Sequence, residues 1–157
     1  MTIVIPSMGR CGSTALFYAI RACVPPHEGR FVHYLADADI RDGEIIKTHD
    51  RAPEVIPDHW RVIYLHGDPD VIRRSVMAQS EEWKRVHFEH FGKVFVDDQV
   101  SLVDSDGLDL MGNRSSWRNL DNVLHIHYDD LFESAEVISE FLGVTITLPK
   151  RINRSTT

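Results

Sequence analysis

The stretch TIVIPSMGRCGSTALFYAI, residues 2–20, decides the fold class of this chain. Its first part, Thr2 to Pro6, is a short apolar run that ends at a turn, which predicts a buried strand. The glycine-containing loop Ser7 to Gly12 follows, and the apolar spacing from Ser13 to Ile20 predicts a helix. A strand, a glycine-containing loop and a helix in this order begin an α/β unit.

Three further segments are apolar and β-branched enough to be strands inside a covered sheet: Glu44–Thr48, Trp60–Leu65 and Asn122–His127. A helix is expected from Pro69, with Asp68 as its N-cap, and another from about Asp129 to Leu142, closing at Gly143. Residues 92–113 are interpreted as an acidic loop with one element in it, for which Val94–Val96 is a candidate strand. We therefore expect one domain over residues 1–157, a three-layer α/β domain with a four- or five-stranded, mostly parallel sheet.

Charge and composition exclude several classes of protein. The 157 residues carry 17 Lys and Arg against 24 Asp and Glu, a net charge of −7, whereas a protein that coats nucleic acid is normally basic. No run approaches the roughly twenty apolar residues that cross a bilayer. The two cysteines, Cys11 and Cys23, cannot form a disulfide framework or a four-thiolate zinc site, so we expect reduced thiols and a cytoplasmic protein. The sequence does not determine the oligomeric state, and a homo-oligomer is one of the possibilities.

The loop after the first strand has the composition of an anion site. Its glycines let the backbone approach an anion, and the following helix contributes free amides and its dipole. Arg10 adds a forked cation, and Ser13 and Thr14 add hydroxyls. An ordinary strand-to-helix turn is the alternative. Because Ser13 follows Gly12 where G-x-x-x-x-G-K-[ST] has its lysine, an ATP-cleaving kinase is disfavoured.

Residues 10–16, RCGSTAL, resemble the phosphosulfate-binding loop of the P-loop sulfotransferases, which reads Pro-Lys/Arg-Ser-Gly-Thr/Ser-Thr-Trp-Leu. Members of that family transfer a sulfuryl group from 3′-phosphoadenosine 5′-phosphosulfate (PAPS) to a hydroxyl or an amine, without a metal. The resemblance implies that five consecutive residues hold the 5′-phosphosulfate: Arg10, Cys11, Gly12, Ser13 and Thr14.

Residues 47–49, Lys-Thr-His, resemble the end of the second core strand in the cytosolic members of this family. The resemblance implies that His49 is the catalytic base and that Lys47 assists. A neutral imidazole can take the proton of an attacking hydroxyl near pH 7. Lys47 and Arg10 would stabilise the charge that develops on the leaving phosphate. The alternative is that His49 is only a polar residue at the end of a strand.

Residues 67–75 resemble the family's segment for the 3′-phosphate, which reads Arg-Asn/Asp-Pro with a serine eight residues after the arginine. Asp68, Pro69 and Ser75 match, but Gly67 stands in place of the arginine. Arg73 and Arg74 flank Ser75 and either compensate for that loss or are exposed helix charges.

Two later segments complete the resemblance. Residues 123–131, VLHIHYDDL, and 141–143, FLG, resemble a strand, turn and helix end that are mainly architectural in the family. The family's closing Arg-Lys-Gly-x-x-Gly segment is absent from the sequence. The last residues, 149–155, carry three cations that either replace that segment or belong to a frayed terminus.

The leading interpretation is a short sulfotransferase that uses PAPS. Two alternatives stay open: a P-loop phosphotransferase with a changed donor, and a non-catalytic relative that binds a sulfated or phosphorylated ligand. No metal is expected, because the pairs His87/His90 and His125/His127 lack an obvious third ligand. The acceptor is expected to be a hydroxyl-bearing and large molecule, such as a glycan, a peptide or a lipid head group. Residues 24–42 and 84–115 would select it.

Overall fold

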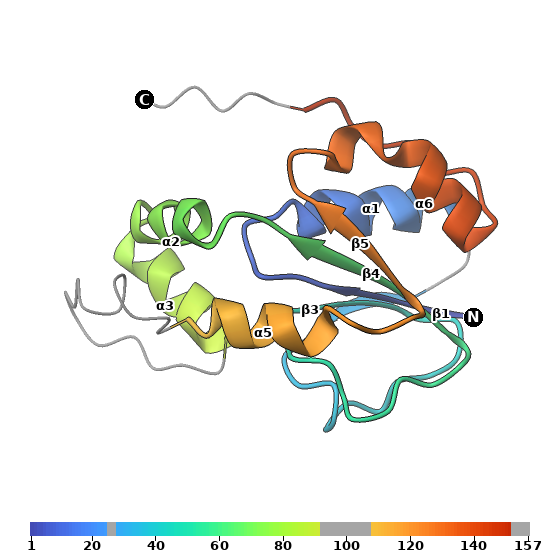
Figure 1. The fold of residues 1–157 in the computed structure, drawn as a ribbon, viewed down its shortest axis with the longest axis horizontal. Coiled ribbons are helices and arrows are strands. Elements are labelled where there is room, and N and C mark those ends of the chain that lie inside the picture. Colours follow the sequence, from blue (N-terminus) through green and yellow to red (C-terminus); the bar gives the residue numbers. More distant parts are fainter. Residues whose placement is uncertain (25–27, 92–107, 152–157) are drawn as a thin grey trace.

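The computed structural model describes residues 1–24, 28–91 and 108–151. These residues form a five-stranded sheet in the order β2-β3-β1-β4-β5, and every neighbouring pair is parallel (Figure 1). The strands are β1 (Thr2–Pro6), β2 (Gly29–Val32), β3 (Ile45–Thr48), β4 (Trp60–His66) and β5 (Val123–His127). The predicted α/β class and parallel sheet are confirmed.

Helices cover both faces of this sheet. Figure 1 shows α1 and α6 on one side and α5 on the other. The helical elements are α1 (Ser13–Cys23), α2 (Pro69–Met77), α3 (Glu81–His90), α5 (Leu110–Trp117), the 3-10 helix η1 (Leu131–Glu133) and α6 (Ala135–Leu142). None of the helices in the described residues is long and apolar enough to cross a membrane.

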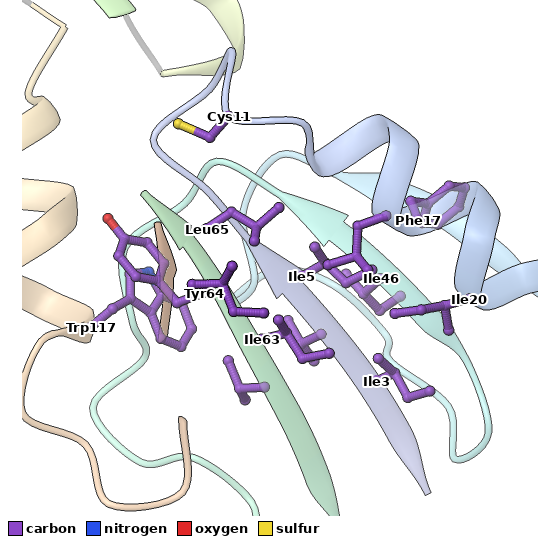
Figure 2. Packing of buried hydrophobic residues seen from close by; sticks show 14 of the residues in the cluster. Ile3, Ile5, Cys11, Phe17, Ile20, Ile46, Ile63, Tyr64, Leu65 and Trp117 are labelled. Atoms are coloured by element: carbon purple, nitrogen blue, oxygen red, sulfur yellow. The ribbon is translucent and has the colours of Figure 1, made fainter. Parts of the chain in front are cut away.

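The core consists of two apolar layers, one against each face of the sheet. All five residues of β1 are buried, which is why its sequence is continuously apolar. Leu16, Phe17 and Ile20 of α1 are buried, so the apolar spacing that predicted this helix marks its core-facing side. On the opposite face, the ring of Tyr64 stacks on Trp117 of α5, with 6.1 Å between ring centroids (Figure 2). Each such fully buried large side chain stabilises the fold by roughly 1.5–3 kcal/mol.

The starts and ends of two helices test the predicted caps. Asp68 caps α2 as predicted, because its Oδ1 accepts the N–H groups of Asp70 and Val71 at 2.7 and 3.1 Å. Gly143 closes α6 at φ 68°, also as predicted. The predicted helix over residues 129–142 begins too early, however. The N–H of Glu133 bonds to the Asp130 carbonyl at 3.0 Å, and the Ser134 hydroxyl donates to the same oxygen at 2.8 Å, so these residues form η1 and a turn.

The strand β2 and the helix α3 were not predicted. The strand β2 is a four-residue edge strand in which only Val32 is fully buried, so it carries little apolar pattern. The helix α3 is highly charged, and among its residues only Phe88 is buried. Residues 92–113, expected to be a loop with one element, include the first residues of the helix α5, while the candidate strand Val94–Val96 lies outside the described residues.

The topology fixes where a ligand can bind. The chain leaves β1 to build β2 and β3 on one side of it, and then crosses to place β4 and β5 on the other side. In open parallel sheets the carboxyl ends of strands at such a reversal form a crevice that binds ligands. The loop after β1 and the ends of β3 and β4 all lie at this edge.

Candidate functional site

The loop Ser7–Gly12 adopts a conformation that requires glycine. Gly9, Arg10 and Gly12 have φ values of 76°, 51° and 75°. A Cβ on Gly12 would lie 2.5 Å from Cδ2 of Leu131, so a side chain there would clash as well as strain the backbone. Gly12 also precedes the first residue of α1, whose leading amides have no partner within the helix. The loop and this helix start therefore offer donors to an anion, as the sequence predicts.

The side chains of the loop point in different directions. Cys11 is buried, its Sγ donates to the Gly9 carbonyl at 2.9 Å, and burial raises its pKa to about 12. Its thiol is therefore neutral at pH 7, so Cys11 can serve an anion only through its backbone N–H. Ser13 is buried at the start of α1, whereas Thr14 is exposed.

His49 follows β3 and is bonded directly to the loop. Its Nδ1 lies 3.0 Å from the carbonyl oxygen of Ser7 and 2.9 Å from the Ser7 hydroxyl. A carbonyl only accepts, so Nδ1 carries the hydrogen and Nε2 keeps the lone pair. Burial, and after it the charge of Lys47, lowers the pKa of His49 to about 3. The imidazole is therefore neutral at pH 7 and held in one tautomer.

Lys47 and a group of rings surround His49. The Lys47 ammonium lies 4.9 Å from the centre of the Phe31 ring, and burial lowers its pKa. His90 and Phe91 lie beside His49, with 5.7 and 5.4 Å between ring centroids. These rings exclude water from one side of the imidazole, which accounts for the low pKa of its conjugate acid.

Arg10 links the loop to α2. Its Nε donates to the Ser75 hydroxyl at 3.0 Å, although the two residues are 65 positions apart. The structure therefore brings together two residues that the sequence assigns to the donor. Arg73 is bonded to Asp70 at 2.7 Å, one turn away on α2, and Arg74 is exposed.

Gly67, at the position of the missing arginine, packs against the loop. A Cβ there would lie 3.6 Å from Cys11 Sγ and 3.7 Å from Tyr128 Cβ, which is ordinary contact. The ring of Tyr128 also lies beside Gly12, where a Cβ would come within 3.3 Å of it. Arg151 lies over that ring at 5.4 Å and donates to Asp129 at 3.0 Å. One of the C-terminal cations is thus placed next to the loop, while Ile152–Thr157 lie outside the described residues.

A cavity of about 100 Å³ opens beside His49. It lies between the end of β3, the end of α3 and the start of α5, and the Arg51–Asp109 ion pair contributes to its wall. The residues that line it are His33, Tyr34, His49, Asp50, Arg51, His90, Phe91, Leu108, Asp109 and Asn113. Among the aromatic side chains of this region, Tyr34 lines the cavity, whereas Phe88 is buried in the core and Trp83 is exposed.

Asn113 is a site residue that sequence reasoning missed. Its amide nitrogen donates to the carbonyls of His49 and Asp50, both at 2.9 Å, and its Oδ1 accepts the Tyr64 hydroxyl at 2.9 Å. It therefore fixes the backbone at His49 and Asp50. No local pattern marks it, because its partners lie 49 to 64 residues away. His90, which lies beside His49, is a second residue without a predicted role at this site. The His87-x-x-His90 spacing is the sequence feature that could have placed it, because the two rings lie on one face of α3 with 6.3 Å between their centroids.

The comparison with solved structures finds the same fold. The crystal structure of mouse sulfotransferase SULT7A1 complexed with PAP aligns with 98% of this chain at a TM-score of 0.54 and 19% sequence identity. The alignment covers 60% of that chain, so this protein spans less than two thirds of its length. No protein-family model matches the sequence, and no curated protein matches it either. At this identity, the likeness establishes a sulfotransferase-type fold.

Proposed function

We propose that this protein is a sulfotransferase that moves the sulfuryl group of PAPS to a hydroxyl acceptor, with His49 as the general base. The observation that carries the proposal is the pair of bonds from His49 Nδ1 to Ser7, the first residue of the loop. They hold a neutral base at the loop that would bind the transferred group, and they leave Nε2 to receive a proton.

Each residue then has a defined task. His49 Nε2 takes the proton of the acceptor hydroxyl while its oxygen forms the new bond to sulfur. The bond between sulfur and the bridging phosphate oxygen breaks, and the electron pair leaves on that oxygen. Lys47, Arg10 and the amides at the start of α1 stabilise this charge. Because the charge of Lys47 helps to lower the pKa of His49, an anionic donor that offsets this charge would raise that pKa from its low value.

The 3′-phosphate is assigned to the side of the loop that faces α2. Ser75 and Arg10 are already bonded there, and Arg73 and Arg74 lie on the same helix. Arg151 and Tyr128 are next to Gly12 and would add a cation and a ring near the nucleotide. Together they would replace the arginine that is absent at Gly67.

The size of the cavity at His49 bears on the acceptor. A volume of about 100 Å³ admits little more than one ring or one sugar-sized group. We propose that only the hydroxyl-bearing end of a larger acceptor enters, with the rest of it outside.

A phosphotransferase with a different donor is the second candidate, and the buried Gly67 is the observation that favours it. Without an arginine at this position, discrimination of the 3′-phosphate rests on Ser75 and its neighbours.

Calorimetry with adenosine 3′,5′-bisphosphate (PAP), ADP and ATP separates the two candidates. The sulfotransferase proposal expects PAP to bind at submillimolar concentration and at least tenfold more tightly than ADP. Equal binding of the three nucleotides, with magnesium-dependent turnover of ATP, would favour the phosphotransferase. No binding of PAP would refute the sulfotransferase proposal.

A further inference from the structure

A second cavity, of about 180 Å³, lies on the α5 face of the sheet, and none of the residues that line it belongs to the loop Ser7–Gly12. It is lined by Tyr64 and His66 of β4, His125 of β5, and Arg114 and Arg118 at the end of α5. These three strand residues alternate along neighbouring strands, so their side chains share one face. None of them has a task in the proposed transfer reaction.

Two imidazole nitrogens in this cavity wall lack partners. His66 Nδ1 and His125 Nε2 are both buried and make no hydrogen bond. A buried polar atom without a partner is costly, and native proteins rarely leave two of them side by side. The two rings are close, with 6.4 Å between centroids. The hydroxyl of Tyr64 does not satisfy them, because it donates to Asn113.

The cavity is also positively charged. Arg114 lies in α5 and Arg118 is its C-cap residue in helical conformation, four positions later, so both side chains lie on the same side of the helix and line the cavity. Within the described parts of the chain, neither has a carboxylate partner. Burial, and after it the charge of Arg114, lowers the pKa of His66 to about 4, and Asp130 opposes this as the smallest contribution. The imidazoles are thus neutral at pH 7, and each has one N–H to donate.

We propose that this cavity is a second anion site, which binds the oxyanion group of a ligand (a sulfate, phosphate or carboxylate) through Arg114, Arg118, His66 and His125. Two guanidinium groups supply the charge and forked donors that such groups prefer, and the unpartnered imidazoles supply further donors. A metal ion does not fit, because two arginines face the cavity. Among the described residues, moreover, no group of three His, Cys, Asp or Glu side chains could hold one.

The test titrates sodium sulfate into the full chain at constant ionic strength and pH 7. It follows the Cε1–Hε1 NMR signals of the histidines, assigned with His66→Gln and His125→Gln. We expect saturable shifts of the His66 and His125 signals. Sulfate should also bind at the loop Ser7–Gly12. Binding there would shift the signal of His87, because the pKa of His87 responds to the charge of Arg10. The variant Arg10→Ala should remove the shift of His87 and leave the shifts of His66 and His125.

The double variant Arg114→Gln/Arg118→Gln should bind sulfate at the His66 and His125 signals at least tenfold more weakly. Its control, Arg41→Gln/Arg61→Gln, makes the same change of net charge at two exposed arginines outside the cavity and should bind like the unmodified chain. If the double variant does not fold, the exposed Arg118 alone, as Arg118→Gln, must still weaken binding. Absence of saturable shifts, or equal affinities of the arginine variants and the control, would overturn the proposal.

Phosphate and acetate at the same ionic strength define the group that is bound. Saturation by sulfate and phosphate alone supports a site for sulfate or phosphate esters. Comparable saturation by acetate supports a site for carboxylates. Failure of PAP to bind the loop would leave these signals unchanged, so the anion site and the proposed function fail independently.

Discussion

The two sides of the central strand β1 are built differently at the carboxyl edge. On the β3 side, His49 is buried and bonded to the backbone of the loop, and rings pack around it. On the β4 side, Gly67 contributes no side chain, and a hydrogen bond between two half-buried side chains, Arg10 and Ser75, joins the loop to α2. His49, the proposed base, is therefore held in place without a ligand, whereas the proposed nucleotide side depends on a contact between partly exposed polar side chains. The first should tolerate substitution far less than the second.

The largest effect is expected on the β3 side, from His49→Asn. The asparagine amide can still donate to the Ser7 carbonyl in place of Nδ1, but it has no equivalent of Nε2. We expect sulfuryl transfer to fall about 10²- to 10⁴-fold while PAP affinity stays within about twofold. Transfer rates and calorimetry measure the two effects.

The matched control for this variant is His59→Asn, which changes an exposed histidine just before β4, at the other end of the sheet. It should behave like the unmodified chain. If His49→Asn loses PAP binding together with turnover, His49 has a structural role instead.

The position of these β3-side residues could be predicted from the sequence, because Lys47 and His49 stand at the end of one strand and the loop follows another. Parallel strands bring such residues to one edge whatever the details of packing. The bond from His49 to Ser7 could not be predicted, since it depends on the register of β1 against β3. The roles of Asn113, His66 and His125 could not be predicted either, because they arise from the packing of α5 on the sheet. Nothing in the local sequence of these residues indicates that packing.

The buried histidine on the β3 side should also make the stability of the chain depend on pH. The pKa of His49, about 3 in the folded chain, lies below the ordinary value of 6.5, so the unfolded chain binds the proton first. The stability present above pH 6.5 is therefore lost as the pH falls toward 3. Between pH 7 and pH 4.5 this amounts to about 2–3 kcal/mol for His49.

Chemical denaturation at the two pH values measures this loss. His49→Asn should be less sensitive to pH than the unmodified chain by about that amount. His59→Asn, at an exposed histidine, should keep the pH sensitivity of the unmodified chain. An unchanged pH dependence in His49→Asn would contradict the buried neutral imidazole.

Substitutions of Gly12, in the loop, and of Gly67, which packs against it, should change the free energy of unfolding by different amounts. Gly12→Ala places a Cβ 2.5 Å from Leu131 and holds alanine at φ 75°, and we expect the free energy of unfolding to fall by about 2–4 kcal/mol. Gly67→Ala is the matched control, because its Cβ would meet only ordinary contacts at 3.6 Å. It should change stability by less than about 0.5 kcal/mol. Equal effects in denaturant titrations would mean that the loop does not hold the conformation described.

The smallest effect is expected on the β4 side, from Ser75→Ala. The variant removes the hydroxyl that accepts from Arg10 Nε, and a single hydrogen bond of this kind contributes about 1 kcal/mol. We expect PAP affinity to fall about fivefold, with stability almost unchanged, because Ser75 is half-buried on the surface of α2. Ser115→Ala, at an exposed position of α5, is the control and should bind PAP like the unmodified chain.

A double-variant cycle on Arg10 and Ser75 tests how the proposed nucleotide side would bind PAP without an arginine at residue 67. If Arg10 is oriented by Ser75, the double variant Arg10→Ala/Ser75→Ala should bind PAP no more weakly than Arg10→Ala alone. If both groups contact the ligand independently, the losses in binding free energy should add. Calorimetry of the four proteins therefore tells whether Ser75 acts through Arg10 or on the phosphate itself. Additive losses would mean that Ser75 contacts the phosphate directly, and Arg10 and Ser75 would then bind the nucleotide independently of each other.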